Sequence, residues 1–285
     1  MLQTRPLSDR FGVEILNLDV NTIREDTFTE IRAAFEEHSV LLFRGQDMTD
    51  ETHLRIAGLF GPIEDRTADE RKPGQGFEIP QVTNVAEDGS TTGEMDLKTL
   101  QLKANFLWHC DSTFMPVPAL VNTLTARVVT ETGGATQLAS TRAAFADMHP
   151  ARQSELRATH LTHHYAHSRS QISAELAARP MFHKWPAQTW RAVWKNPANG
   201  REAAYVASHA YAVNGREGRE AERWIQALIA ECTQQNYVYS HDWTVGDVLI
   251  WDQRAILHRG TPWPYYQPRT LKSICSSVTE TDGLT

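Results

Sequence analysis

Residues 108–114 are Trp108-His109-Cys110-Asp111-Ser112-Thr113-Phe114, a stretch rich in side chains that favour β-strands. Alternate residues of a strand point to the same side. If this stretch is a strand, His109 and Asp111 project together and Cys110 points the other way. An imidazole and a carboxylate side by side can bind a first-row dication such as iron(II), manganese or zinc. The pair therefore predicts a metal site that takes a third ligand from elsewhere in the chain.

The third candidate ligand is His258, far downstream. It follows Val248-Leu249-Ile250-Trp251, an apolar run typical of a buried strand. Two histidines and a carboxylate on one side of a metal leave the other side open, as in the non-haem iron oxygenases. A bare His-x-Asp pair also has an ordinary interpretation, because a buried histidine can bond to a nearby carboxylate without any metal. The wider pattern of residues decides between the two interpretations.

Two more positions complete the pattern. Thr136 follows Gly133-Gly134-Ala135, and Arg269 lies eleven residues after His258. With them the sequence resembles the iron(II)- and 2-oxoglutarate-dependent dioxygenases of the taurine dioxygenase and 2,4-dichlorophenoxyacetate dioxygenase (TauD/TfdA) family. The resemblance begins at Phe11-Gly12-Val13-Glu14-Ile15 and continues through Val40-Leu41-Leu42-Phe43-Arg44-Gly45-Gln46 to Arg269, so it spans nearly the whole chain.

The resemblance implies a role for each of these residues. His109, Asp111 and His258 would hold iron(II), next to the cosubstrates 2-oxoglutarate and dioxygen. Arg269 and Thr136 match the family positions that bind the far carboxylate of 2-oxoglutarate, a task that suits the paired donors of a guanidinium. Related halogenases have a small residue in place of the carboxylate ligand, so Asp111 favours hydroxylation. The resemblance also implies a homo-oligomer.

The composition is that of an ordinary globular protein, since 41% of the 285 residues are hydrophobic and 22% are charged. The net charge of −7 argues against a nucleic-acid partner. The sequence contains neither an apolar run of about 18 residues nor a signal-peptide pattern. Cys110, Cys232 and Cys275 are scattered and odd in number, which indicates packing residues in a reducing compartment. We therefore expect a cytoplasmic enzyme that acts on a small organic acid and has no nucleic-acid or membrane partner.

Short strand-like segments between helices predict a mainly β fold with helical insertions. The expected strands lie at 12–18, 40–43, 82–85, 120–129, 136–139, 190–193, 203–206, 237–239 and 248–251, with a hairpin turn at 196–200. Apolar spacing and capping residues predict helices at 28–35, 49–60, 140–148, 150–159 and 218–235. This arrangement suits a jelly roll, the double-stranded β-helix, and the family resemblance implies the same fold. With no linker or repeat in the sequence, residues 1–285 are predicted to form a single domain.

Two irregular regions, around 66–100 and 165–185, are candidates for loops that close over the substrate. Long loops in compact domains often cover a binding site, although a mobile surface loop without a role is the alternative. His163, His164 and His167 cluster near the second region. They could form a second metal site, but we interpret them as part of a strand and loop at the mouth of the active site.

The substrate is harder to predict. Asn105 matches a substrate-side position of the family, whereas Phe114 and His209 are candidate pocket residues that could equally pack in the core. Family members with anionic substrates often have a further arginine one or four residues after the 2-oxoglutarate arginine, where this chain has Thr270 and Ser273. That departure argues against a taurine-like sulfonate. The charge could instead come from Lys103, Arg169, Lys272 or His209.

Several aromatic and thioether side chains near the predicted ligands favour a flat apolar acid, namely Phe114, Met115, Trp185, Trp190, Trp263, Tyr265 and Tyr266. The sequences Met115-Pro116-Val117 and Leu257-His258-Arg259-Gly260-Thr261-Pro262-Trp263 also look most like the aryloxyalkanoate branch of the family. We therefore predict a dioxygenase that cleaves an aryloxyalkanoate ether by hydroxylating the carbon next to the ether oxygen. Alkyl sulfate esters, alkylsulfonates and taurine are the alternatives.

Two rivals come from other classes. A zinc hydrolase would also use two histidines, an aspartate and an open coordination position, but the sequence offers no matched general base. A non-catalytic small-molecule binding module would keep a degenerate metal site, whereas here the three candidate ligands are all present. Iron(II) and 2-oxoglutarate without oxygen should give a visible charge-transfer band only for the dioxygenase.

Overall fold

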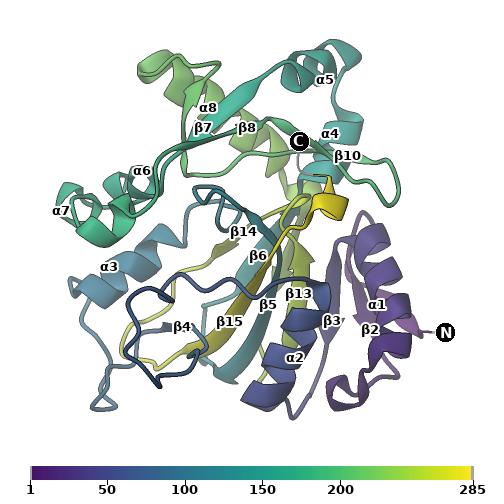
Figure 1. Cartoon of the computed structure of the whole chain (residues 1–285), viewed down its shortest axis with the longest axis vertical. Coiled ribbons are helices and arrows are strands. Elements are labelled where there is room, and N and C mark those ends of the chain that lie inside the picture. The colour runs from purple at the N-terminus through teal and green to yellow at the C-terminus, as the bar shows by residue number, and fades with distance from the viewer. Residues whose placement is uncertain (1, 284–285) are drawn as a thin grey trace.

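A computed structural model describes residues 2–283 of the chain, and its centre is a seven-stranded sheet (Figure 1). The strand order is β1-β2-β3-β13-β5-β15-β4, with β2 and β3 parallel and the other neighbours antiparallel. The strands are β1 (Thr4–Pro6), β2 (Val13–Ile15), β3 (Val40–Phe43), β4 (Gln81–Thr83), β5 (Ala119–Val128), β13 (Val248–Asp252) and β15 (Thr270–Ser277). The longest strands, β5 and β15, therefore pair with each other, and β5 also pairs with β13.

A smaller sheet, β12-β6-β14, packs on one face of the central sheet and forms a roll with it. Its strands are β6 (Thr136–Ser140), β12 (Val238–His241) and β14 (Ile256–Gly260). Side chains of both sheets share one buried cluster, which includes Leu124, Leu138, Leu249, Trp251, Ile256 and Leu271. Along β13 the side chains alternate, so that Leu249 and Trp251 fill the roll whereas Val248 and Ile250 join the cluster on the opposite face.

Two helices cover that opposite face: α1 (Glu25–His38) and α2 (Asp50–Phe60). Helix α1 ends at Ser39, which adopts a left-handed conformation with φ of 63°. Helix α2 begins at Thr49, whose hydroxyl accepts a hydrogen bond from the Thr52 amide at 3.1 Å. It stops at Gly61, where a Cβ would lie 2.7 Å from the Ser277 carbonyl oxygen of β15. The sequence signals at both helix ends are thus used as predicted.

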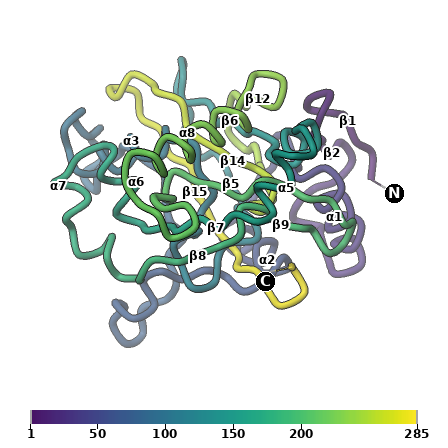
Figure 2. The backbone as a smooth tube through the Cα atoms, turned by 90° about the horizontal axis from the view of Figure 1, so that it is seen from above, coloured from purple at the N-terminus to yellow at the C-terminus, as the bar shows by residue number. Residues whose placement is uncertain are grey.

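A third layer covers the other end of the roll (Figure 2). It contains the sheet β11-β7-β8 and the hairpin β9-β10, with bounds β7 (His160–His163), β8 (Gln188–Arg191), β9 (Val193–Lys195), β10 (Glu202–Ala204) and β11 (Ala210–Val213). The helices beside these strands are α4 (Thr141–Asp147), α5 (Pro150–Arg157) and α8 (Arg219–Cys232). In both views α3 (Leu97–Ala104), α6 (Tyr165–Ser170) and α7 (Ala174–Ala177) gather at the end of the molecule away from the N-terminus (Figures 1 and 2). Short 3-10 turns complete the chain: η1 (Val20–Thr22), η2 (Pro180–His183), η3 (Gln235–Tyr237) and η4 (Glu280–Asp282).

The predicted sheet-rich fold with helical insertions is confirmed, but some local predictions are wrong. The region 165–185 is mostly helical because α6, α7 and η2 fall within it. Each of these helices is too short to show an apolar repeat in the sequence. Helix α3 was not predicted, whereas 66–80 and 84–96 contain neither helix nor strand, as expected of loops. No helix within residues 2–283 has the length and apolar character needed to cross a membrane.

A buried ion cluster fixes the turn between β13 and β14 to the N- and C-terminal parts of the chain. Arg254 lies in that turn and is only 2% exposed. Its Nη2 donates to Glu36 of α1 at 2.6 Å, and its Nε donates to Asp252 at 2.8 Å. Arg32 of α1 in turn donates to Asp282 at 2.7 Å, which ties down the C-terminal turn. Helix α1, the β13–β14 turn and η4 therefore share one set of buried charges.

We expect Arg254→Met to lower the free energy of unfolding by about 3–5 kcal/mol, because it leaves buried carboxylates without their cation. Urea denaturation followed by circular dichroism measures this loss. Arg223→Met removes an exposed arginine of α8 and serves as the control. A loss below about 1 kcal/mol, the range of exposed ion pairs, would contradict a structural role for the cluster.

Candidate metal centre and its two cavities

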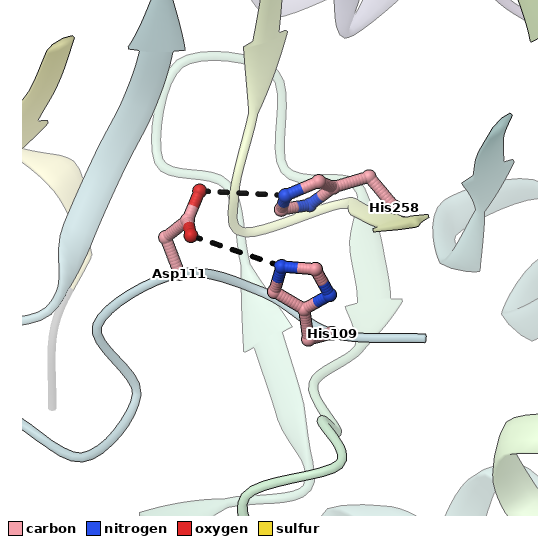
Figure 3. Close-up of side chains that lie close together, drawn as sticks. All are labelled: His109, Asp111 and His258. Carbon is pink, nitrogen blue, oxygen red and sulfur yellow. Dashed lines mark ion pairs between the residues drawn. The ribbon is translucent and has the colours of Figure 1, made fainter. Parts of the chain in front are cut away.

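The three predicted metal ligands converge at the edge of the roll (Figure 3). His109 and His258 face each other in an isolated antiparallel bridge, with hydrogen bonds from the His109 amide at 3.0 Å and from the His258 amide at 2.8 Å. The predicted strand at 108–114 is wrong beyond this bridge, because the chain turns at Ser112 with φ of 58°. His109 and Asp111 nevertheless point to the same place, while the Cys110 thiol turns into the core.

The geometry of the three side chains suits one metal ion. Their ligand atoms all lie within 4.8 Å of one another. The His109 Nε2 is 3.9 Å from one oxygen of Asp111, and the His258 Nε2 is 3.5 Å from the other (Figure 3). Both imidazoles therefore present Nε2 to the carboxylate. Among residues 2–283 this is the one group of three or more histidine, cysteine or acidic side chains close enough to share a metal, so His163, His164 and His167 do not form a second such site.

Neighbouring groups hold two of the ligands in position. The His109 Nδ1 lies 2.7 Å from the Leu107 carbonyl oxygen, so it carries the ring proton and leaves Nε2 free for a metal. One oxygen of Asp111 accepts hydrogen bonds from the side-chain amides of Asn122, at 2.9 Å, and Gln253, at 2.6 Å. Such partners orient metal ligands and tune their affinity. Sequence reasoning missed both amides because neither is near Asp111 in the chain.

The electrostatics keep the ligands in the form that binds a metal. Burial lowers the pKa of His258 to about 3 and also lowers the pKa of His109. Burial alone would raise the pKa of Asp111, but the neighbouring His258, His109 and Arg66 hold it well below its usual range. Two neutral imidazoles and one carboxylate are therefore available at neutral pH, and metal binding requires no proton to leave.

A small cavity of about 90 Å³ opens on one side of the ligands, and both predicted 2-oxoglutarate residues line it. Arg269 is 4% exposed, and its Nε and Nη2 donate to the Gly134 carbonyl oxygen at 3.1 and 2.9 Å. Burial lowers the pKa of Arg269 only to about 10, so the guanidinium stays charged at neutral pH. Gly134 has a φ of 71°, and a Cβ on it would lie 2.9 Å from the Thr130 hydroxyl and 3.1 Å from the Arg269 Nε, so the position favours glycine. The structure pairs this arginine with no carboxylate among residues 2–283.

The Thr136 hydroxyl faces the same small cavity. It accepts a hydrogen bond from the Trp243 indole at 2.9 Å, which leaves its own proton free to donate to a ligand. Trp263 also lines this cavity, with its ring 4.9 Å from the Arg269 guanidinium carbon. Trp263 therefore lines the small cavity, beside Arg269, and not the larger one.

A larger cavity of about 420 Å³ adjoins the small one and shares His109 and Asp111 with it. Asn105, Phe114 and His209, the three candidate substrate residues, all line it. Phe114 stacks on Tyr165 with ring centres 3.8 Å apart, and the His209 ring lies 6.2 Å from that of His109. Of the remaining aromatic and thioether candidates Trp185 lines this cavity, whereas the lining of both cavities excludes Met115, Trp190, Tyr265 and Tyr266.

The two predicted lid regions meet beside this larger cavity. Lys184 follows η2 and donates to Asp69 at 2.5 Å, to Glu70 at 2.9 Å and to the Arg66 carbonyl oxygen at 2.7 Å. Residues of both regions line the cavity. The substrate-side wall is thus built from segments that are about a hundred residues apart in sequence.

Comparison with known proteins identifies the family. The profile of the taurine catabolism dioxygenase TauD, TfdA family matches residues 3–275. The chain belongs to this family. A relative, the (S)-phenoxypropionate/alpha-ketoglutarate-dioxygenase of Sphingobium herbicidovorans, is 33% identical over 275 residues, which is 93% of this chain and 91% of the relative. The alpha-ketoglutarate-dependent 2,4-dichlorophenoxyacetate dioxygenase of Cupriavidus pinatubonensis is 30% identical and covers 94% of each chain.

Solved structures show the same TauD/TfdA fold. The crystal structure of AAD-2 in complex with Mn(II) and N-oxalylglycine superposes with a TM-score of 0.90 and 28% identity, covering 100% of this chain and 99% of AAD-2. The predicted jelly roll and family are therefore confirmed. The predicted reaction class is confirmed as well: the protein is a dioxygenase that requires iron(II), 2-oxoglutarate and dioxygen.

Proposed function

We propose that His109, Asp111 and His258 hold the iron and that the small cavity holds 2-oxoglutarate. Support comes from the donor set, because two neutral imidazole nitrogens and a carboxylate oxygen converge next to two cavities. The buried Arg269 has the charge and the paired donors for the far carboxylate of 2-oxoglutarate, and Thr136 adds a hydroxyl donor. This assignment gives a role to the buried arginine that lines the small cavity without a carboxylate partner.

With iron, 2-oxoglutarate and dioxygen bound, the cofactor supplies the oxidising power that hydroxylates a substrate carbon. The protein positions the metal ligands and the bound molecules. Asn122 and Gln253 keep the Asp111 carboxylate turned towards the histidines, and Arg269 and Thr136 of the small cavity orient the cosubstrate. The larger cavity holds the substrate beside the open side of the metal. Membership of a dioxygenase family favours this chemistry over a zinc hydrolase or a non-catalytic binding module.

We propose that the substrate is an aryloxyalkanoate. The observation that supports it most directly is the aromatic wall of the larger cavity, where Phe114, Tyr165 and Trp185 lie together beside the metal ligands. Aromatic rings favour a flat apolar ligand through contact area and stacking. Hydroxylation of the carbon next to the ether oxygen gives a product that splits into a phenol and an oxo acid. The relatives named for phenoxypropionate and 2,4-dichlorophenoxyacetate act on this class of compound.

An alkylsulfonate or taurine fits this chain less well. Ser273 stands where a further arginine would bind a sulfonate, and its hydroxyl donates to Asn122 at 3.0 Å. A small zwitterion would also leave most of the larger cavity empty. Alkyl sulfate esters remain the second candidate within the family.

The remaining predictions concern organisation. We propose that residues 1–285 act as a single domain and that 66–100 and 165–185 cover the substrate. The contacts of Lys184 with residues of the 66–100 region support the proposal that both regions cover the substrate.

We also propose that the protein is a cytoplasmic homo-oligomer. The cysteines within residues 2–283 are free, which supports a reducing compartment. Light scattering of the purified protein measures the assembly.

Asp111→Ala should abolish succinate formation that depends on oxygen, and it should abolish the visible band formed with iron(II) and 2-oxoglutarate in the absence of oxygen. His109→Ala and His258→Ala should do the same, because two ligands rarely hold a metal. Gln253→Leu should weaken Mn(II) binding about 10–100-fold, since it frees the Asp111 carboxylate. The control is Asp242→Ala, which removes an exposed carboxylate. Unchanged turnover in any of the three alanine variants removes that residue from the metal site.

Arg269→Ala should raise the KM for 2-oxoglutarate while Mn(II) binding is kept. The lost contact is a buried charged hydrogen-bond pair worth about 2–5 kcal/mol. Thr136→Ala should raise this KM less, because it removes one neutral donor whose hydrogen bond is worth about 1–3 kcal/mol. Steady-state kinetics with varied 2-oxoglutarate measure both effects. If the KM for 2-oxoglutarate does not move in Arg269→Ala, the distal carboxylate binds elsewhere.

A substrate panel tests the predicted class. Phenoxyacetate and both enantiomers of phenoxypropionate should stimulate succinate release strongly, an alkyl sulfate weakly and taurine least. The physical reason is the aromatic wall, which gains little from a compact sulfonate. Strong stimulation by taurine with none by the phenoxy acids would reject the aryloxyalkanoate assignment and leave the dioxygenase class intact.

A further inference from the structure

Four arginines are buried within residues 2–283, and they fall into two pairs. Arg142 and Arg254 each contact a carboxylate, that of Asp252. Arg269 and Arg169 contact none. Arg269 lines the small cavity and Arg169 lines the larger one. The two buried arginines without an acidic partner are thus the two that line the cavities next to His109 and Asp111.

The surroundings of Arg169 leave part of its guanidinium unused. Its Nη1 donates to the Ser168 hydroxyl at 2.9 Å, and its Nη2 donates to the Tyr165 hydroxyl at 3.3 Å. The Nε is buried and has no hydrogen-bond partner. The Tyr165 and Phe182 rings lie 4.6 and 5.3 Å from the guanidinium carbon, which stabilises the cation in part. A buried charge with an unsatisfied donor is costly unless an anion arrives to pair with it.

The other basic side chains are already engaged. Lys103 and Lys272, two of the candidates from the sequence, pair with Glu94 and Asp50 and line neither cavity. His209 does line the larger cavity, but burial and the neighbouring Arg169 keep its pKa well below the usual value, so it is neutral. Of the four candidates that the sequence offered for the substrate anion, Arg169 is therefore the one that is charged, lines the larger cavity and has no carboxylate partner.

The other cations of this cavity carry their own partners. Arg66 pairs with Glu64, and Lys184 pairs with Asp69 and Glu70. Lys98 has no carboxylate, but it is less buried and donates to the Val85 carbonyl oxygen at 2.5 Å. Arg169 is therefore the buried cation of the cavity with donors left for a ligand.

The chemistry of the proposed substrate places its anion next to the metal. In an aryloxyalkanoate of this kind, the carbon to be hydroxylated carries both the ether oxygen and the carboxylate. A cation that binds the carboxylate must therefore lie close to the metal ligands. Arg169 meets this condition, because its neighbour Tyr165 contacts His209, and the His209 ring lies next to that of His109.

We propose that Arg169 binds the carboxylate of the organic-acid substrate and so selects acids over neutral aryl ethers. This proposal rests on the proposed function of the larger cavity. The carboxylate pairs with the free edge of the guanidinium, and the aryl group lies along Phe114 and Trp185. A cation at this position does the work that an arginine at position 273 would do for a sulfonate, from a different element of the fold.

The test compares phenoxyacetate with 2-phenoxyacetamide, which has nearly the same shape and no charge. In Arg169→Met, kcat/KM for phenoxyacetate should fall about 30-fold or more, and kcat/KM for the amide should change little. Arg169→Lys should recover part of the preference for the acid. Arg179→Met, which removes an exposed arginine of the same segment, is the matched control and should behave as the unchanged protein. The KM for 2-oxoglutarate should stay constant in all three variants.

A second measurement does not depend on turnover. Phenoxyacetate binding to the metal-free protein, followed by quenching of tryptophan fluorescence, should be lost in Arg169→Met and kept in Arg179→Met. If acid and amide lose kcat/KM equally, or if the KM for 2-oxoglutarate rises instead, the proposal for Arg169 is wrong. Binding that depends on Arg169 without turnover of any phenoxy acid would overturn the proposed function and keep the anion site. Absence of phenoxyacetate binding to the unchanged protein overturns both.

Discussion

Two backbone hydrogen bonds between His109 and His258 are the contact on which the rest of the site depends. They join the loop after α3 to strand β14, and so they bring together residues that are about 150 positions apart. The bridge places the two imidazoles side by side, and Asp111, two residues after His109 and directly before the turn at Ser112, points its carboxylate at both of them. A metal site of this kind needs no long strand at the motif. It needs one register-defining pair and a sharp turn.

Buried charged side chains occur in two different settings in this molecule. The ion cluster around Arg254 neutralises itself and holds α1, the β13–β14 turn and the C-terminal turn together. Near the metal ligands the buried positive charges have no carboxylate partners, because Arg269 and Arg169 face cavities instead. Both ligands proposed for these cavities are organic acids. In this proposal the paired buried charges stabilise the fold, and the buried arginines without a carboxylate partner bind the two acids.

The convergence of His109, Asp111 and His258 could be predicted from the sequence, and so could the place of Arg269 at the adjoining cavity, because these residue types and their spacing resemble those of a family. The strands at 40–43 and 248–251 were also readable, since their apolar runs are buried on both faces. The local structure of residues 108–114 could not be predicted in the same way. Their side chains favour a β-strand, but the chain turns at Ser112, which adopts a left-handed conformation. Asn122 and Gln253 escaped detection for another reason. Their contact with Asp111 depends on the pairing of β5 with β13, which no local pattern reveals.

The turn between β13 and β14 serves both ends of the molecule through adjacent residues. Gln253 bonds to the Asp111 carboxylate, and Arg254 enters the ion cluster with Glu36 and Asp282. The C-terminal turn and the Asp111 ligand are therefore connected through two residues that are neighbours in the chain. A substitution that displaces Asp282 of η4 would move Arg254, and through it Gln253, the amide that holds the Asp111 carboxylate.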